Sequence, residues 1–222
     1  MSTKQTEQAP IAVDEVLGKS EAYVLKNKNT IIGTVAAIVI LIAGCIIYNN
    51  YVVEPAEQEA AEALFPAQAL FAAGSFQEAL DGDGVNLGFV AIADEYSSTT
   101  SGNLANAYAG LSLAQLGRYE EAIPYLKNFD GDDQMIAPAV LGALGNCYAQ
   151  TGDNNAAINN FTKAASKADN NTISAHYLMQ AALMHEQAGN NSKALDLYEE
   201  IKEKYPVSAQ GVDIDKYINR VK

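Results

Sequence analysis

The sequence predicts an all-α protein in which a helix-turn-helix solenoid follows one N-terminal transmembrane helix. Three observations carry this prediction: an uncharged apolar run from Ile31 to Ile47, a pattern of small residues and glycines that recurs along the rest of the chain, and an Ala-rich composition without Trp. Alanine is the best helix former, whereas strands favour β-branched and aromatic residues. We expect a disordered cytoplasmic tail over residues 1–29, a span over 30–53, a repeat domain over 54–206 and a capping helix over 207–222.

The apolar run is long enough to cross a membrane. Extended over residues 30–53, a helix rising ~1.5 Å per residue covers a hydrocarbon core of ~30 Å. Lys26 and Lys28 precede the run, and glutamates follow it from Glu54 onward. Positively charged flanks stay in the cytoplasm, so the repeat domain is expected on the far side. In a bacterium this describes a single-pass inner-membrane protein with a cytoplasmic N-terminus and a periplasmic repeat domain.

Two other fates of the apolar run are consistent with its composition. A cleaved signal peptide normally has a short basic start, but about 30 residues precede this run. The stretch from Ile42 to Cys45 reads Ile-Ala-Gly-Cys, which resembles a bacterial lipobox whose Cys is lipidated. The apolar run continues beyond Cys45 through Ile46 and Ile47, which favours a span. A lipidated Cys45 stays open as the alternative.

The charge distribution limits the partners. Four lysines and four acidic residues cancel before residue 54, so the whole net charge of -13 lies in residues 54–222. A domain of that charge repels nucleic acid and anionic lipid headgroups. The expected partners are therefore proteins.

The sequence offers no catalytic, cofactor or metal site. Cys45 and Cys147 are the only cysteines and lie in different predicted segments, so we expect no disulfide. His176 and His185 are nine residues apart, which directs them to opposite faces of one helix. The acidic turn at residues 81–84 lacks the later acidic ligands of a calcium loop. The protein is therefore expected not to be an enzyme.

The repeated pattern centres on four glycines, at intervals of 43, 35 and 37 residues. A small residue lies seven positions before each glycine, and an Ala lies five positions after it. Nine positions after each of the last three glycines is a large side chain. Small residues let paired helices approach, and the glycine permits the turn between them. The four glycines are Gly74, Gly117, Gly152 and Gly189, and the small residues before them are Ala67, Gly110, Gly145 and Ala182. The alanines after them are Ala79, Ala122, Ala157 and Ala194, and the large residues are Leu126, Phe161 and Tyr198.

This pattern resembles the tetratricopeptide repeat, a helix pair of ~34 residues. The resemblance covers roughly residues 57–206, and its last copy closes with Tyr205-Pro206, where the family often has Pro. It implies a solenoid whose first helices line a groove that binds protein or extended peptide segments. Carried over position by position, the groove is expected to include Leu111, Gln115, Asn146, Gln150, His176, Met179, Leu183 and Gln187. The predicted groove holds no Lys or Arg, so a clamp for a C-terminal carboxylate is not expected.

The layout of residues 20–222 is similar to the single-span periplasmic tetratricopeptide proteins related to the ancillary subunit of the bacterial SecYEG translocon. The cues are residues 88–96, the stretch Gly102-Asn103-Leu104-Ala105 and the closing Tyr205-Pro206. The resemblance implies contacts with the translocon or with periplasmic chaperones. A structural assembly factor of an envelope or secretion complex and a sensor signalling through residues 1–29 are the alternatives. The sequence does not indicate an oligomeric state.

Overall fold

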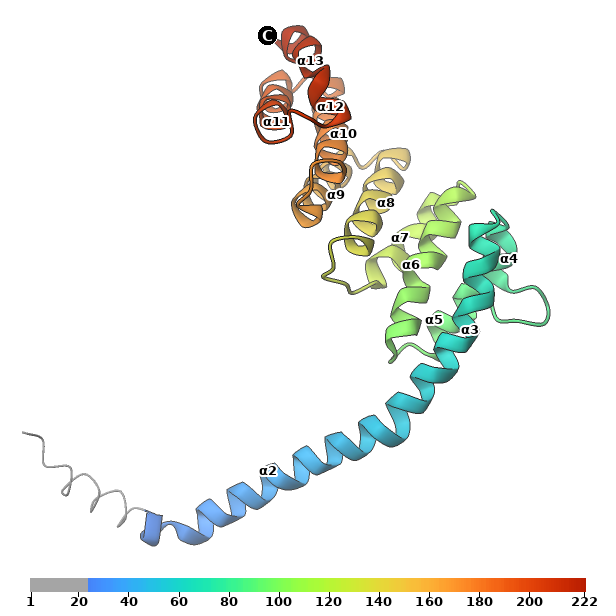
Figure 1. The fold of residues 1–222 in the computed structure, drawn as a ribbon, viewed down its shortest axis with the longest axis vertical. Coiled ribbons are helices and arrows are strands. Elements are labelled where there is room, and N and C mark those ends of the chain that lie inside the picture. Colours follow the sequence, from blue (N-terminus) through green and yellow to red (C-terminus); the bar gives the residue numbers. More distant parts are fainter. Residues whose placement is uncertain (1–23) are drawn as a thin grey trace, which may run out of the picture. The chain divides into compact units, whose positions relative to one another are not determined.

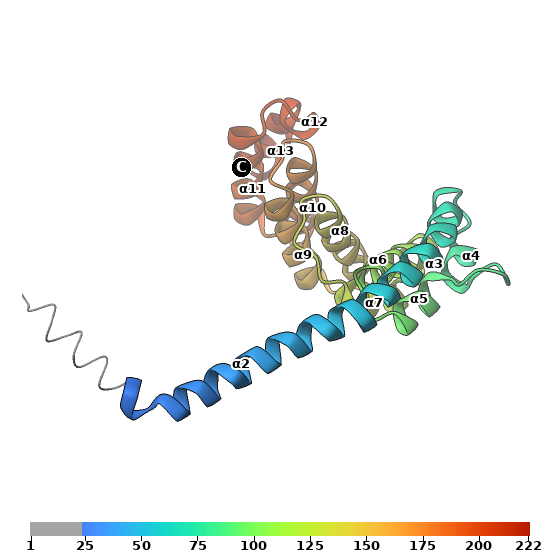
Figure 2. The same ribbon diagram turned by 60° about the horizontal axis from the view of Figure 1, so that its bottom comes forward.

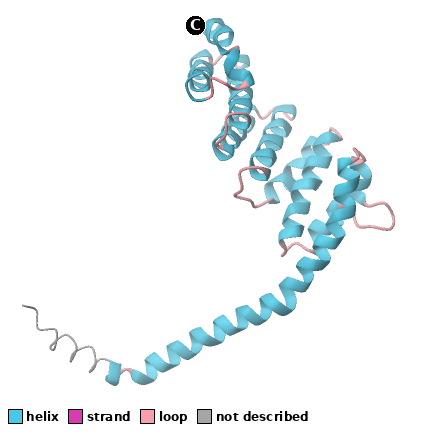
Figure 3. Cartoon of the chain, in the orientation of Figure 1, coloured by secondary structure: helices cyan, strands magenta, loops and turns pink. Residues whose placement is uncertain are grey.

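A computed structural model describes residues 24–222. The chain divides into two compact units, one that ends at Val52 and one from Val53 to Lys222. Figure 3 shows that the described part of the chain is built from helices and loops. Its one β-type pairing is an isolated antiparallel bridge between Gly82 and Leu87. The all-α prediction is confirmed.

The N-terminal unit contains one long apolar helix. Helix α2 comprises Lys28–Tyr48 and is followed directly by the π-helical segment η1, Asn49–Val53. None of the α2 residues is buried in the structure, and the helix is long and apolar enough to cross a membrane. The Thr34 hydroxyl donates a hydrogen bond of 2.9 Å to the Thr30 carbonyl, which satisfies that polar group within the helix.

The second unit is a succession of helices (Figure 1). Helices α6 and α7, α8 and α9, and α10 and α11 form consecutive antiparallel pairs, and each pair packs on the next (Figure 2). Short helices α12 and α13 follow the last pair. The bounds are α3 Glu54–Ala72, α4 Phe76–Asp81, α5 Phe89–Glu95, α6 Thr100–Gln115, α7 Tyr119–Asn128, α8 Ile136–Gln150, α9 Asn154–Ala168, α10 Ile173–Gln187, α11 Asn191–Lys204, α12 Ala209–Val212 and α13 Ile214–Val221.

The predicted turn glycines end the first helix of each pair. The φ angles of Gly74, Gly117, Gly152 and Gly189 are 80°, 76°, 87° and 73°. The amide that follows each glycine donates to a carbonyl five residues before it, as from Arg118 to Leu113. This is the Schellman arrangement, in which a left-handed residue satisfies the last helical carbonyls.

Small residues opposite large ones set the spacing within the pairs. A Cβ on Gly110 would lie 2.5 Å from Leu126 Cγ, and one on Gly145 would lie 2.6 Å from the Phe161 ring. Ala182 and Tyr198 are both fully buried in the last pair. Each first helix therefore lies close enough to its partner to leave no room for a larger side chain.

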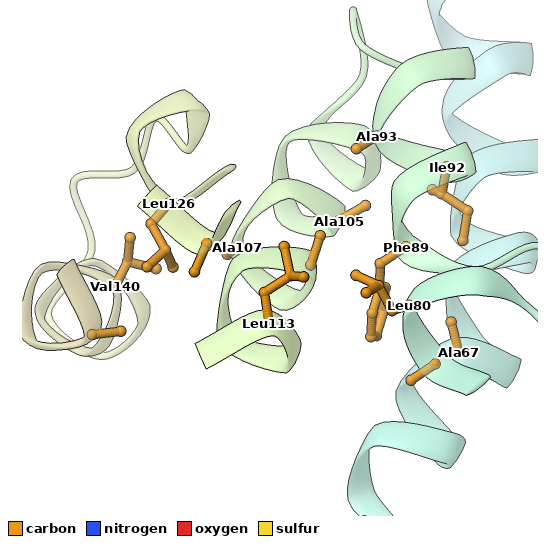
Figure 4. Packing of buried hydrophobic residues seen from close by; sticks show 14 of the residues in the cluster. Ala67, Leu80, Phe89, Ile92, Ala93, Ala105, Ala107, Leu113, Leu126 and Val140 are labelled. Carbon is orange, nitrogen blue, oxygen red and sulfur yellow. The ribbon is translucent and has the colours of Figure 1, made fainter. Parts of the chain in front are cut away.

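The apolar core runs through the whole repeat unit in consecutive clusters. Figure 4 shows the first of them, in which residues of α3 to α8 interdigitate. Its Phe89 is stacked on Tyr108, with ring centroids 5.0 Å apart. The last cluster ends under α13, whose buried residues are Ile214, Ile218 and Val221.

The connections from α5 to α6 and from α11 to α12 share a turn that the repeat spacing does not reveal. The Thr99 hydroxyl donates to the Tyr96 carbonyl at 2.7 Å and accepts from the Gly102 amide at 2.9 Å. Ser208 makes the same two bonds, at 2.7 and 2.9 Å, with the Tyr205 carbonyl and the Gly211 amide. The shared pattern is Tyr, then Thr or Ser three residues later, then Gly three residues after that. It ends one helix and caps the next.

Glu57 ties the beginning of the repeat unit to α6. Its carboxylate accepts from the Thr100 and Ser101 amides at 2.6 and 2.9 Å and from the Ser101 hydroxyl at 2.6 Å. Burial acts to raise the pKa of Glu57, but the hydrogen bonds from Ser101 and Thr100 outweigh it, so the pKa lies below its ordinary value. The anion also lies at a helix N-terminus, where the macrodipole favours it.

Glu57→Gln is expected to lower the free energy of unfolding by about 1–2 kcal/mol at neutral pH, because charged hydrogen bonds are lost at a partly exposed site. The folded pKa is depressed, so the stabilisation is complete above the ordinary value of 4.5 and is lost as the pH falls through the folded pKa. Urea unfolding at a series of pH values measures this difference. The exposed Glu62→Gln on the same helix is the control, and a difference that persisted at low pH would contradict the assignment.

Candidate functional site

The described residues contain no group of three or more His, Cys, Asp or Glu side chains placed to hold a metal. Both cysteines are free thiols, and burial raises the pKa of Cys147 to about 11, which keeps it protonated. His176 is exposed, whereas His185 is half-buried with no hydrogen-bond partner for its Nδ1. Burial, and secondarily Lys193, lowers the pKa of His185. A packed, neutral imidazole fits these observations.

The predicted groove residues divide into two groups by exposure. Four are exposed at their helix surfaces: Gln115, Asn146, Gln150 and Gln187; His176 is exposed as well. Leu111 and Leu183 are half-buried against the core clusters. Met179 is only 7% exposed and belongs to the core between α10 and α11, so a partner can reach little of it.

The exposed residues also lie at opposite ends of the first helices. Gln115, Gln150 and Gln187 are the last residues of α6, α8 and α10. His176 lies in the first turn of α10 instead. About 15 residues of α8, or ~22 Å, separate the two ends.

A cavity of about 290 Å³ opens at the end of the first helices where His176 lies. It is formed between the beginning of α8, the beginning of α10 and α12. His176 is its one charged or imidazole-bearing residue, and the other lining residues are mostly apolar or aromatic: Met135, Ala139, Thr172, Ile173, Tyr177, Ala209 and Gln210.

The Tyr177 side chain of α10 packs against α8 beside this cavity. A Cβ on Gly142 would overlap the Tyr177 ring, so the ring lies directly against the α8 backbone. The Asp133 carboxylate accepts from the Met135 and Ile136 amides at 2.7 and 2.5 Å, which fixes the start of α8. The cavity is therefore formed by ordered elements on three sides.

Exposed apolar side chains lie in the cavity lining and at the two ends of α12, which borders it. Met135 is 78% exposed, and Val207 and Val212, at either end of α12, are exposed to a similar degree. Large exposed apolar residues beside a cavity are typical of interaction surfaces. The sequence analysis missed Met135 and α12. The signal available was Met135-Ile136, an apolar pair that follows the acidic loop after Gln134.

Comparison with known families identifies the repeats. Two family models, each described as tetratricopeptide repeat, match residues 138–169 and residues 177–208. These segments correspond to the α8–α9 pair and to most of the α10–α11 pair and its following turn. The α6–α7 pair has the same glycine turn and small-to-large packing. No curated protein matched the chain.

Tetratricopeptide repeats are generally non-enzymatic modules that bind proteins or peptides. The chain therefore combines repeats of a type that generally binds proteins or peptides with an N-terminal helix that has the length and composition to cross a membrane.

Proposed function

We propose that this protein is a membrane-anchored, non-enzymatic scaffold that binds an extended segment of another protein along the exposed side of α8 and α10. The observation that supports the proposal best is the apolar cavity beside His176 and the exposed Met135. An apolar side chain of the partner enters the cavity, and burying a Leu or Phe there contributes about 1.5–3 kcal/mol.

The polar groups along the same side suit a peptide backbone. The His176 imidazole and the Gln150 carboxamide each offer a hydrogen-bond donor and an acceptor. An extended peptide of about seven residues, at ~3.3 Å each, spans the ~22 Å between the cavity and Gln150. Carboxamides bind backbone groups whatever the charge of the peptide, so the surface recognises apolar spacing more than charge.

The proposed location is the bacterial inner membrane, crossed once by α2, with residues 1–29 in the cytoplasm and the repeat domain in the periplasm. The lysines before the span and the glutamates after it support this orientation. There the scaffold assists the Sec translocon or periplasmic chaperones with chains that are still extended. Protease added outside the inner membrane is expected to digest the repeat domain and to leave residues 1–29 protected.

Photo-crosslinking in cells tests the binding surface. A benzophenone side chain at Met135 of the full-length chain is expected to capture translocon subunits, periplasmic chaperones or exported polypeptides, identified by mass spectrometry. Ala139→Asp places a charge in the cavity wall and is expected to reduce this capture at least fivefold, because an apolar anchor is lost. Gln134→Asp, an exposed change just before the cavity, is the control.

A probe at Asn159, exposed on α9, reports the opposite outcome. Equal capture of the same partners from Asn159 and from Met135 contradicts the proposed surface. Capture that survives Ala139→Asp unchanged contradicts the role of the cavity.

A further inference from the structure

A second cavity lies on a different face of the repeat domain. Its volume is about 510 Å³, and it opens between α7, the loop before α8, α8 and α9. The apolar wall includes Leu126, Val140 and Leu141. Ala139, which lines the cavity beside His176, is about a quarter of a turn around α8 from Val140 and about half a turn from Leu141. The two cavities have no lining residue in common.

Lysines surround this second cavity in a domain that is otherwise strongly acidic. Lys127 of α7 and Lys163 and Lys167 of α9 all line it. Helix α9 contains no acidic residue, although residues 54–222 carry a net charge of -13. Like charges at positions i and i+4 destabilise a helix slightly. Lys163 and Lys167 therefore lower the stability of α9 by a small amount when no ligand is bound.

Two of the three cavity lysines, Lys127 and Lys163, form no ion pair within the described part of the chain. Residues 54–222 contain ten Lys and Arg residues, since four of the chain's 14 precede residue 54. Seven of the ten form ion pairs, including Lys167 with Asp132. Of the cations in residues 54–222, the three for which no ion pair forms are Lys127, Lys163 and Lys193. Two of these three therefore border one apolar cavity.

The loop that borders the cavity is fixed at both ends. The Asn103 carboxamide of α6 donates to the Asp130 carbonyl at 2.6 Å and accepts from the Asp130 amide at 2.8 Å. At the other end, Asp133 caps the first amides of α8. The ion pair between Lys167 and Asp132 joins the middle of the loop to α9. A preformed site loses little conformational entropy when it binds.

We infer that this cavity binds an acidic, apolar-bearing segment of a partner protein. Apolar side chains of the segment enter the cavity, and one or two carboxylates pair with Lys127 and Lys163. In the acidic loop beside the cavity, Asp132 pairs with Lys167 and the Asp133 carboxylate accepts from amides at the start of α8. More distant acidic residues repel such a segment only weakly, because salt screens charges beyond ~8 Å at physiological ionic strength. At contact distance the two unpaired ammonium groups dominate.

An anionic bilayer fits the same lysines less well. A bilayer presents a continuous negative surface, so docking brings many headgroups against a domain of net charge -13. A short peptide brings only its own few carboxylates. Charge complementarity therefore favours the peptide over the lipid surface.

Fluorescence polarisation with a defined probe tests the inference. The full-length chain, in nanodiscs of zwitterionic lipid, is titrated into a labelled peptide in which Leu and Phe alternate with Glu. A peptide of about 12 residues is long enough to span the site. Binding is expected to weaken with added salt. Lys127→Gln combined with Lys163→Gln is expected to weaken it about fourfold to twentyfold, since each partly exposed pair contributes up to about fivefold.

Matched variants separate charge and cavity effects. Lys193→Gln removes the third unpaired lysine, on α11 and outside the cavity, and is expected to change affinity less than twofold. Ser166→Phe, at an exposed position on the cavity wall, fills the space and is expected to abolish binding. Met135→Asp, in the other cavity, is expected to have no effect, so failure here and failure of the proposed function are distinguishable.

Several results would overturn the inference. One is an affinity of the double lysine variant equal to that of the unchanged chain. Another is unchanged binding when Lys replaces Glu in the peptide, or when Ser replaces its Leu and Phe. A third is loss of peptide binding in Met135→Asp. Lysine-dependent capture of the nanodisc-held chain by phosphatidylglycerol vesicles, without peptide binding, would assign the site to lipid instead.

Discussion

Gly102→Ala is expected to destabilise the repeat domain by about 3 kcal/mol. A Cβ at this position would overlap the Tyr96 carbonyl oxygen, and a backbone atom cannot rotate away as a side chain can. Overpacking of this kind costs about 1–3 kcal/mol or more, and the shift also weakens the Thr99 cap, which is worth ~1 kcal/mol. The higher helix propensity of Ala offsets only about 1 kcal/mol.

Thermal unfolding of the full-length chain in detergent, followed by far-UV circular dichroism, measures the effect. For a domain of this size the transition is expected to fall by roughly 6–12 °C. Gly211→Ala is expected to behave alike, because its Cβ would overlap the Tyr205 carbonyl in the equivalent turn. Gln115→Ala, at an exposed helix end, is the control. If neither Gly102→Ala nor Gly211→Ala lowered the temperature of thermal unfolding, these turns would not need glycine.

The sequence predicted the parts of the fold that depend on local spacing. A turn glycine, the small residue before it and the Ala after it lie within 13 residues of one another, so their roles follow from the geometry of one helix pair. Gly74, Gly117, Gly152 and Gly189 all have the left-handed conformation expected of them. The uncharged run that forms much of α2 is similarly visible without any tertiary information.

The candidate sites depend on residues far apart in the sequence, which spacing alone does not bring together. The cavity beside His176 combines Met135 of the loop before α8 with Ala209 of α12. The significance of Lys127 and Lys163 appears only when the ion pairs of the other cations and the lining of the cavity are known. The sequence analysis expected no Lys or Arg in the groove formed by the first helix of each pair. Lys127 and Lys163 lie instead on the second helices of their pairs, α7 and α9.

The shared turn around Thr99 and Ser208 was missed for a different reason. Its two copies are 109 residues apart, about three repeat intervals, and their central residues are Thr in one and Ser in the other. Both hydroxyls make the same pair of hydrogen bonds, so the two turns share their hydrogen bonding although their central residues differ. It marks where one helix pair gives way to the next element.

Phe161→Ala is expected to have the largest effect of any single change considered, a loss of about 3–5 kcal/mol. Phe161 is 2% exposed, and its ring fills the space that Gly145 leaves between α8 and α9. Removing it costs the transfer free energy of the ring and leaves a cavity that the surrounding helices close only in part. Urea unfolding of the full-length chain measures the loss. Thr162→Ala, an exposed neighbour, is the control and is expected to change stability by less than about 0.5 kcal/mol.

The same contact predicts that the effect of Gly145→Ala on the free energy of unfolding has opposite signs with and without the Phe161 ring. In the wild-type chain Gly145→Ala is expected to destabilise by about 1–2 kcal/mol, because the new methyl group collides with the Phe161 ring. In the Phe161→Ala background the ring is absent, so Gly145→Ala is expected to stabilise by about 1 kcal/mol through helix propensity and partial filling of the void. A double-mutant cycle isolates this coupling. Equal effects of Gly145→Ala in the two backgrounds would contradict the view that a small residue opposite a large one sets the spacing of the helix pair.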